Sequence, residues 1–202
     1  VGDDVGYVHV LTGNGNGSYD LEDTINVGDL YYDYSGFLSG DFDGDGQVDL
    51  VAAAWRHAVV LARAPGGNFG SRRVDLPLDW SASTCLAAGD FDKDGLPDLI
   101  AGRDGSPGMV TILSKIADVL PWRRDYRLWE GTATDLAVRD LNNDDAVDLV
   151  VSVRDEGNTT LEVILADGDG GFLAPTSYAS QLNSIEAIVL ANLNADEYQD
   201  LV

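Results

Sequence analysis

The chain has 202 residues, 45% of them hydrophobic and 8% aromatic, and its 35 acidic against 12 basic residues give a net charge of −23. This apolar content is enough for a buried core and argues against a disordered acidic chain. The negative charge excludes binding of nucleic acid through a general electrostatic field, so cations are the natural partners. No apolar run reaches membrane-spanning length, and we expect no membrane insertion.

Four acidic stretches of similar sequence follow one another along the chain. They read DFDGDGQVDLV from Asp41, DFDKDGLPDLI from Asp90, DLNNDDAVDLV from Asp140 and NLNADEYQDLV from Asn192. Their first residues, 41, 90, 140 and 192, are 49, 50 and 52 residues apart. A period of this size indicates a propeller, a solenoid or an array.

Each repeat contains short apolar runs in the same order. One run precedes the acidic stretch (GFLSG, CLAAG, DLAVR, AIVLA), a second follows it (DLVAAA, DLIAG, DLVVSV), and a third comes next (YVHVL, AVVLA, MVTIL, LEVIL). A glycine-rich turn and a more polar fourth run close the unit, which is the pattern of a four-stranded propeller blade. The Ala-rich segment DLVAAAWRHAVVLARA could form a helix, but its counterpart AGRDGSPGMVTIL contains Gly and Pro, so strands are predicted.

The sequence therefore predicts an all-β protein, a β-propeller of four-stranded antiparallel blades with about four blade equivalents. We expect a single propeller segment over residues 1–202. Its expected parts are the back half of a blade (1–35), whole blades (36–84, 85–134 and 135–185) and the front half of a blade (186–202). The two halves could join to close a small ring, since propellers have about 4 to 8 blades. We favour a segment of a larger ring, in a mature or excised piece of a longer protein, because the last acidic stretch ends on the final residue.

The first acidic stretch places oxygen donors at alternate residues. Asp41, Asp43, Asp45 and Asp49 occupy positions 1, 3, 5 and 9, and Gln47 at position 7 offers its backbone carbonyl. Carboxylates this close repel one another unless a cation lies between them. Calcium suits such a site because it takes about six to eight oxygen ligands, whereas magnesium demands a stricter octahedron. No stretch contains His or Cys, which argues against zinc.

The spacing matches the beginning of an EF-hand loop but not its end. An EF-hand needs a bidentate Glu at position 12 and a following helix, whereas position 12 here is Ala52, Ala101 or Val151 and a strand is predicted to follow. The Asp at position 9 replaces that Glu, and Gly46 at position 6 permits a left-handed turn. One such stretch could be an ordinary acidic turn, but four at an even period indicate a metal-binding repeat.

The stretches GDFDGDGQVDLV and GDFDKDGLPDLIAG resemble the calcium-loop repeats called FG-GAP or VCBS repeats. These repeats build the β-propeller of integrin α subunits and of many secreted lectins, adhesins and polysaccharide-active proteins. The resemblance extends unit by unit over essentially the whole chain. It implies a calcium loop between the first and second strands of each blade and a ring of usually seven blades, while function stays open because one fold serves many functions.

The resemblance assigns ligands to positions 1, 3, 5, 7 and 9 of each loop. The predicted metal ligands are Asp41, Asp43, Asp45, Gln47 and Asp49; Asp90, Asp92, Asp94, Leu96 and Asp98; Asp140, Asn142, Asp144, Ala146 and Asp148; and Asn192, Asn194, Asp196, Tyr198 and Asp200. We expect three to four Ca²⁺ ions. The fourth site is the doubtful one, since it has Asn at positions 1 and 3 and Glu197 at position 6, where Gly is usual; the third loop has Asp145 at that position.

Several aromatic residues are also candidates for packing or binding. Tyr31, Trp80 and Trp129 each lie ten or eleven residues before an acidic stretch, and this recurrence favours packing between blades. Trp55 and Trp122 do not recur in phase, so they are the better candidates for stacking on a sugar ring. The cluster PWRRDYRLW contains three Arg on a predicted outermost strand, where charges protect a sheet edge or could dock an anionic partner.

Residues with catalytic potential have simpler structural explanations. Cys85 is the single cysteine and lies in an apolar run, which predicts a buried, inert thiol. His9 and His57 have no recognisable nucleophile motif beside them. Carboxylate pairs for glycoside chemistry are conceivable in so acidic a chain, but the obvious ones are committed to metal. We therefore expect no enzyme activity in this chain.

The sequence favours a calcium-binding β-propeller of an extracellular or cell-surface protein. It would mediate adhesion, bind a protein or glycan ligand, or act as a scaffold, and it would continue into further blades or domains. Two glycosylation sequons, at Asn16 and Asn158, are compatible with secretion. The alternatives are a non-catalytic propeller part of a secreted carbohydrate-active enzyme and a structural subunit of a surface assembly.

Overall fold

All regular structure in the computed structural model is β-strand. The structure describes residues 6–27, 34–54, 57–77, 83–103, 108–114, 122–129, 131–168, 170–179, 185, 187–196 and 198–202. The strands are β1 (Tyr7–Gly13), β2 (Tyr19–Asn26), β3 (Tyr34–Gly40), β4 (Asp49–Ala54), β5 (His57–Arg63), β6 (Phe69–Pro77), β7 (Ser83–Gly89), β8 (Asp98–Arg103), β9 (Gly108–Ser114), β10 (Trp122–Trp129), β11 (Thr132–Arg139), β12 (Asp148–Asp155), β13 (Asn158–Ile164), β14 (Thr176–Ala179), β15 (Leu190–Ala191) and β16 (Asp200–Leu201). Within these described ranges there is no helix long and apolar enough to cross a membrane.

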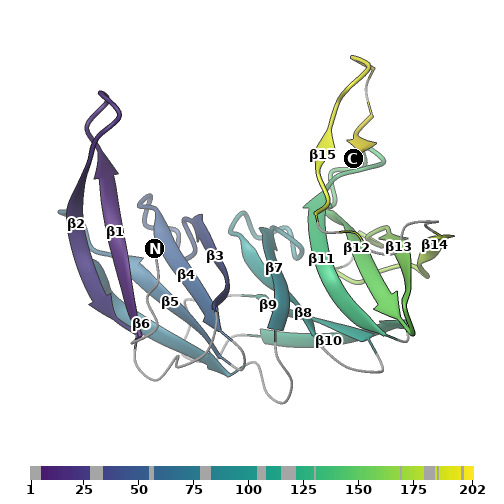
Figure 1. Cartoon of the computed structure of the whole chain (residues 1–202), viewed down its shortest axis with the longest axis horizontal. Helices are drawn as coiled ribbons and strands as arrows, with labels where there is room; N and C mark the ends of the chain where they lie inside the picture. The colour runs from purple at the N-terminus through teal and green to yellow at the C-terminus, as the bar shows by residue number, and fades with distance from the viewer. Residues whose placement is uncertain are drawn as a thin grey trace.

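The strands form three four-stranded antiparallel sheets and two strand pairs. The sheets have the orders β3-β4-β5-β6, β7-β8-β9-β10 and β11-β12-β13-β14, and the pairs are β1-β2 and β15-β16. Figure 1 shows the sheets side by side along an open arc, with β1-β2 at one end and β15-β16 at the other. This is the blade architecture of a β-propeller, as predicted. The number of blades in a complete ring stays a prediction.

The Ala-rich segment that could have formed a helix is the pair β4-β5. Val51 pairs with Val60 and Ala53 with Ala58 in this hairpin. Five consecutive residues of β5, Ala58 to Ala62, are buried, so both faces of the strand are covered. A strand buried on both faces has a continuous apolar run rather than an alternating one, which explains why this segment resembles a buried helix in sequence.

The hydrophobic core lies between neighbouring blades rather than within one. Leu99 and Ala101 of β8 pack with residues of the β3–β6 blade, while Ile100 between them packs with the β11–β14 blade. Alternate side chains of one strand thus point into two different interfaces. Cys85 belongs to the second interface and is 5% exposed, so the prediction of a buried thiol is confirmed.

Polar side chains also join neighbouring blades. Arg73 of β6 donates a hydrogen bond to the carbonyl of Val27 at 2.9 Å, just beyond β2. Arg124 of β10 donates to the carbonyl of Gly170, which also accepts from the Tyr126 hydroxyl at 3.0 Å. Because Gly170 follows β13 in the next blade, Arg124 connects two blades. This contact is additional to the edge protection expected for the arginines of this strand, and edge protection itself stays a prediction.

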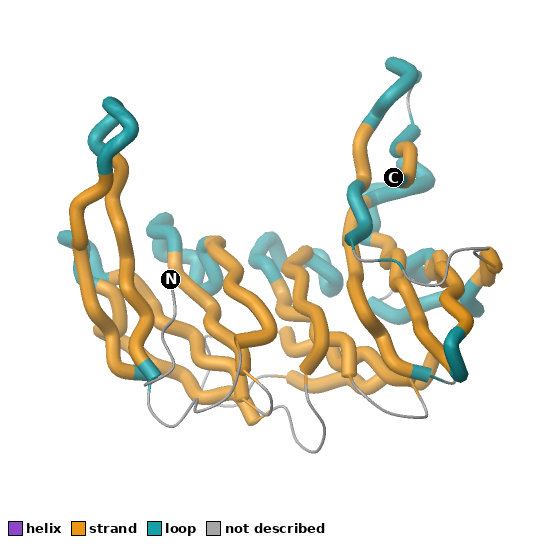
Figure 2. The backbone as a smooth tube through the Cα atoms, viewed as in Figure 1, coloured by secondary structure: helices purple, strands orange, loops and turns teal. Residues whose placement is uncertain are grey.

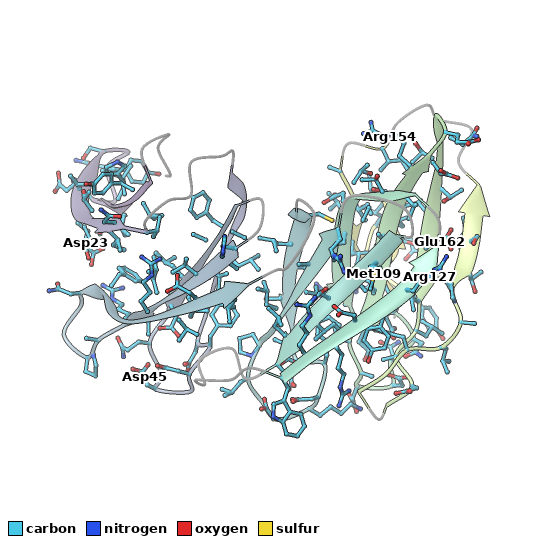
Figure 3. All side chains as sticks on the ribbon, turned by 90° about the horizontal axis from the view of Figure 1, so that it is seen from below. Asp23, Asp45, Met109, Arg127, Arg154 and Glu162 are labelled. Carbon is cyan, nitrogen blue, oxygen red and sulfur yellow. The ribbon has the colours of Figure 1, made fainter. Side chains whose placement is uncertain are left out.

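Among the residues whose side chains the structure describes, one buried acidic side chain lies outside the acidic stretches, in β13. Glu162 is 5% exposed and accepts hydrogen bonds from the hydroxyls of Ser177 at 2.6 Å and Thr160 at 3.3 Å. Figure 3 shows it in the part of the molecule where Arg127 and Met109 of the adjacent blade also lie. The two hydroxyl donors satisfy the carboxylate, so we assign it a structural role.

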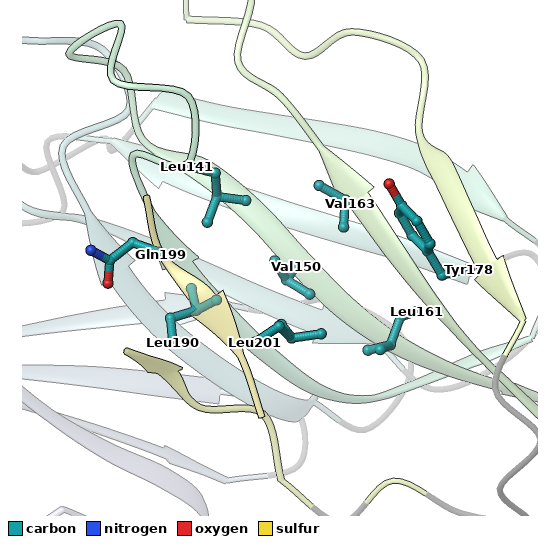
Figure 4. A pocket seen from close by; sticks show the side chains of 8 residues that line it. All are labelled: Leu141, Val150, Leu161, Val163, Tyr178, Leu190, Gln199 and Leu201. Carbon is teal, nitrogen blue, oxygen red and sulfur yellow. The ribbon is translucent and has the colours of Figure 1, made fainter. Parts of the chain in front are cut away.

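The last interface, between the β11–β14 blade and β15-β16, contains an apolar cavity of about 440 Å³. Figure 4 shows the residues that line it: Leu141, Val150, Leu161, Val163, Tyr178, Leu190, Gln199 and Leu201. Two short strands cover this face of the blade, whereas a full four-stranded sheet covers the corresponding face of each of the other two blades. The packing is consequently looser here, and Tyr178 is 57% exposed.

The aromatic candidates are only partly covered by the structure. Trp122 begins β10 and is 61% exposed, so its side chain is accessible, and its stacking on a sugar stays a prediction. Trp129 ends the same strand. Tyr31, Trp55 and Trp80 lie outside the described residues.

Candidate metal centre

The four acidic stretches form four equivalent loops between first and second strands. Loop 1 (41–48) joins β3 to β4, loop 2 (90–97) joins β7 to β8, loop 3 (140–147) joins β11 to β12, and loop 4 (192–199) joins β15 to β16. Figure 2 shows them on the same side of the arc. This is the placement that the resemblance implied.

The position-1 carboxylate organises each of the first three loops. In loop 1, Asp41 accepts hydrogen bonds from the backbone amides of Gly44 (2.8 Å) and Gly46 (2.9 Å). In loop 2, Asp90 accepts from the amide of Gly95 at 3.0 Å. In loop 3, Asp140 accepts from the amide of Asp145 at 2.9 Å. These bonds curl the chain around the first side chain, so the next oxygen donors turn toward the same region.

Positions 3 and 5 form local turns in which a side-chain oxygen accepts from the backbone amide two residues later. In loop 1, Asp43 accepts from the amide of Asp45 at 3.2 Å, and Asp45 accepts from the amide of Gln47 at 2.7 Å. In loop 2, Asp94 likewise accepts from the amide of Leu96 at 2.9 Å. The loops are thus held in a defined shape by their own side chains.

Two positions in each of loops 1 to 3, and position 4 of loop 4, have left-handed backbone. Position 6 has φ of 83° at Gly46 and 88° at Gly95, as predicted, and Asp145 adopts 62° in loop 3. Position 4 is left-handed as well, which was not predicted from the sequence. Its residues are Gly44 (φ 76°), Lys93 (59°), Asn143 (60°) and Ala195 (61°). Gly44 and Asn143 are residue types that favour this region and were the available signal.

The position-9 aspartate ties its loop to the rest of the blade. Asp49 is fully buried and accepts from the amides of Phe42 (3.0 Å) and of Arg63 (2.9 Å) at the end of β5. Asp148 makes the same pair of contacts, with the amides of Leu141 and Ala166, both at 2.8 Å. This side chain therefore joins the loop to the end of the third strand.

Burial raises the pKa of the position-9 carboxylates of loops 1, 2 and 3. Burial raises the pKa of Asp98 to about 6, the hydrogen bond from the Phe91 amide opposes this, and the nearby charges of Asp92 and Asp94 add to it. Burial also raises the pKa of Asp49 and of Asp148. Each buried carboxylate is thus short of positive charge, which a bound cation would supply.

Loops 1 and 2 each bring three carboxylates together. Oxygens of Asp41, Asp43 and Asp49 lie within 4.8 Å of one another, and so do those of the corresponding Asp90, Asp92 and Asp98. Either group could hold a metal ion, and an all-carboxylate donor set fits a hard cation such as calcium. The position-5 residues Asp45 and Asp94 are not part of these groups, and their role as ligands stays a prediction, like that of the position-7 carbonyls.

Loop 3 replaces one carboxylate of this group by an amide, and loop 4 replaces two. The side-chain amide of Asn142 donates to Asp144 at 2.8 Å, and Asn194 donates to Asp196 at the same distance. The hydrogen bond from Asn142 is the main reason why the pKa of Asp144 is lowered. Among the residues that the structure covers, no group of three carboxylates forms in these loops. Their own hydrogen bonds thus satisfy part of the acidic charge without an ion.

Loop 4 keeps the frame of the other loops with fewer charges. Asp200 accepts from the amide of Leu193 at 2.7 Å, as the other position-9 residues do at position 2. The side-chain oxygen of Asn192 accepts from the amide of Ala195, and Tyr198 is 55% exposed. Glu197 lies outside the described residues.

Residues 41–101 match the model of a family described as the FG-GAP-like repeat. This part of the chain carries an FG-GAP-like repeat. The match includes loops 1 and 2. The β11–β14 blade after it has the same strand order, and loops 3 and 4 keep the hydrogen bond from the position-2 amide to the position-9 carboxylate. FG-GAP-like repeats form propeller-type folds, in agreement with the observed sheets. The VCBS and integrin-like details of the resemblance stay predictions. A comparison with curated proteins found no match.

Proposed function

We propose that this chain is a calcium-binding β-propeller module of an extracellular or cell-surface protein. The observation that carries the proposal is the pair of three-carboxylate groups in loops 1 and 2, inside the FG-GAP-like repeats. All donors are hard oxygens, and the loops are already folded by their own hydrogen bonds. Such loops fit calcium better than magnesium, which keeps several waters and demands a regular octahedron.

The number of ions follows from the charge of each loop. Loops 1 and 2 have four acidic ligand positions each, loop 3 has three and loop 4 has two. Calcium affinity rises with the number of charged ligands, so loops 1 and 2 bind most tightly, loop 3 more weakly and loop 4 most weakly. Three to four ions would be bound at millimolar calcium, the concentration range of extracellular modules.

The metal ions would serve the fold. When bound, calcium supplies the positive charge that the buried aspartates lack, and it would hold the first and second strands of a blade together. Asp49 and Asp148 extend this link to the end of the third strand through their amide contacts. A partner would then bind away from the metal ligands, on a face of the ring or on an outer edge.

We infer that the partner is a protein or a glycan and that the chain itself does not catalyse a reaction. The family supports an extracellular setting, and both sequon residues, Asn16 and Asn158, are exposed. A net charge of −23 disfavours nucleic acid. A glycan array would separate a lectin from a scaffold, and turnover of polysaccharides would reveal a carbohydrate-active enzyme instead.

Calorimetry on chelator-treated protein tests the calcium proposal. Titration with Ca²⁺ should show saturable binding at several sites, and Zn²⁺ should be a poor substitute. Asp43→Asn keeps the side-chain oxygen that accepts from the Asp45 amide but removes a charge, so it should abolish or greatly weaken one tight site. Asp20→Asn, a change of the same kind at an exposed residue of β2, is the control and should leave binding unchanged. If no calcium binds, the proposed function is wrong.

A further inference from the structure

Neighbouring metal loops are in direct contact. A Cβ built on Gly40, the residue before loop 1, would lie 3.3 Å from Cγ of Pro97 at position 8 of loop 2. The same contact recurs one blade later, where a Cβ on Gly89 would lie 2.9 Å from Cγ1 of Val147 in loop 3. At the equivalent place before loop 3 stands Arg139. Glycine therefore allows close approach between loops 1 and 2 and between loops 2 and 3.

A second contact joins the interiors of loops 1 and 2. Cδ2 of Leu96 lies 3.2 Å from where a Cβ on Gly44 would be, so the leucine side chain rests on the backbone of loop 1. The amide of Gly44 donates to Asp41 at 2.8 Å, and the amide of Leu96 donates to Asp94 at 2.9 Å. The contact thus joins Gly44 to Leu96, and the backbone amide of each supports a carboxylate at a predicted metal site.

We propose that loops 1 and 2 bind calcium cooperatively, with the Leu96–Gly44 contact as the coupling element. This inference rests on the proposed function, since it concerns the same two metal groups. Without an ion, the repulsion of four acidic residues opposes the hydrogen bonds that shape each loop and leaves it more conformational freedom than the ion-bound loop has. An ion in loop 1 orders Gly44 and so provides a fixed surface for Leu96. Loop 2 then loses less conformational freedom when it binds its own ion, which is positive cooperativity.

Electrostatic repulsion between the two ions works against this coupling. Each ion, however, cancels only two of the four acidic charges of its loop, so both loops stay negative and attractive to cations. Salt at 0.15 M also screens interactions between exposed charges beyond about 8 Å. The packing contact is not screened, so the cooperative term persists at physiological ionic strength.

Nuclear magnetic resonance of the full chain can follow each loop separately. The backbone amides of Gly46 and Gly95 donate to the position-1 carboxylates of their own loops and report their metal state. We would titrate calcium in a chelator-buffered series at 0.15 M salt. Asp43→Asn should weaken calcium binding at loop 2 by about fivefold or more, within the usual range of coupling. By reciprocity, Asp92→Asn should weaken loop 1 by the same factor.

Leu96→Ala isolates the contact because it retains the backbone amide and carbonyl of loop 2. In this background, Asp43→Asn should no longer change the affinity of loop 2. Leu173→Ala, a change of the same kind at a side chain that is 53% exposed, is the matched control and should preserve the coupling. Equal loop-2 affinities in wild type and Asp43→Asn would overturn the coupling while leaving calcium binding intact. Loss of all calcium binding in the wild type would instead overturn the proposed function.

Discussion

At the scale of single residues, the aspartate at position 9 has two tasks that conflict in the absence of metal. It must accept hydrogen bonds from backbone amides inside the blade, which requires burial, and it must stay ionised to bind a cation. Asp98 is 1% exposed, and burial raises its pKa to about 6. The metal-free protein therefore contains a carboxylate that is unfavourable at neutral pH, and the bound ion would relieve it.

This conflict predicts a pH dependence for the calcium-free protein. The folded-state pKa of about 6 exceeds the ordinary value of 3.8, so the folded state binds the proton more tightly than the unfolded state does. The contribution of Asp98 to the free energy of unfolding should consequently fall by roughly 2 to 3 kcal/mol as pH rises from about 4 to about 6. The Asp98→Asn variant has no carboxyl group to ionise at this position, so its free energy of unfolding should not show this fall. In urea unfolding without calcium, the free energy of unfolding of the variant should rise relative to that of the wild type between pH 4 and pH 7.

The comparison with calcium present provides the control. The ion favours the ionised carboxylate, so the wild type should then be the more stable protein at pH 7. In calcium-free protein, the difference in free energy of unfolding between wild type and Asp98→Asn should change with pH. A difference that stays constant would contradict the raised pKa of Asp98.

Sequence reasoning reached some of these residues and missed others for physical reasons. The alternating acidic residues and Gly46 were visible because their residue types match the conformation they adopt. Lys93 and Ala195 gave no such signal, because neither type favours the left-handed backbone that each adopts. The hydrogen bond between Asn142 and Asp144 and the contact of Arg124 with Gly170 depend on side-chain direction, which spacing alone does not determine.

At the scale of strands, the repeat was a better guide than local propensity. The segment that forms β4 and β5 is rich in Ala, and only comparison with its Gly- and Pro-containing counterpart indicated strands. The fold class and the strand order in each blade followed from this comparison. The cavity at the last interface could not be predicted, because it depends on how far β15-β16 covers the preceding blade.

Equivalent strands in different blades should therefore lose different amounts of stability when a valine side chain is replaced by alanine. Val60 of β5 pairs with Val51 and is 1% exposed in a filled interface, whereas Val163 of β13 pairs with Val150 and lines the cavity. Val60→Ala should cost about 2 kcal/mol of unfolding free energy, because it loses burial and leaves a void. Val163→Ala should cost about 1 kcal/mol or less, because fewer contacts exist to lose.

Urea unfolding of both variants in saturating calcium is the measurement. Equal costs would mean that the face at Val163 is as well covered in solution as the face at Val60, and the looser packing of the last interface would then be disproved.

At the scale of the whole molecule, the arrangement makes the blades depend on one another. Each core cluster is shared by two neighbours, and the acidic loops lie on one side of the arc, where loop 2 approaches both the loop 1 region and loop 3. A blade isolated from its neighbours would expose one face of each central strand. Metal binding at one end of the blades and hydrophobic packing between them should therefore stabilise the same cooperative unit.

This dependence predicts a large effect of calcium on global stability. The proposed calcium sites exist in the folded loops and not in the unfolded chain, so calcium at about 100 times the dissociation constant should add roughly 2.7 kcal/mol for each independent site. Chelation should lower the melting temperature by many degrees. Asp43→Asn should remove one site's contribution together with part of its neighbour's, because the two loops are coupled. Asp20→Asn, at an exposed residue of β2, should leave the calcium-dependent shift unchanged. Melting curves that coincide with and without chelator would show that the ions do not support the fold, and the acidic loops would then need a role outside it.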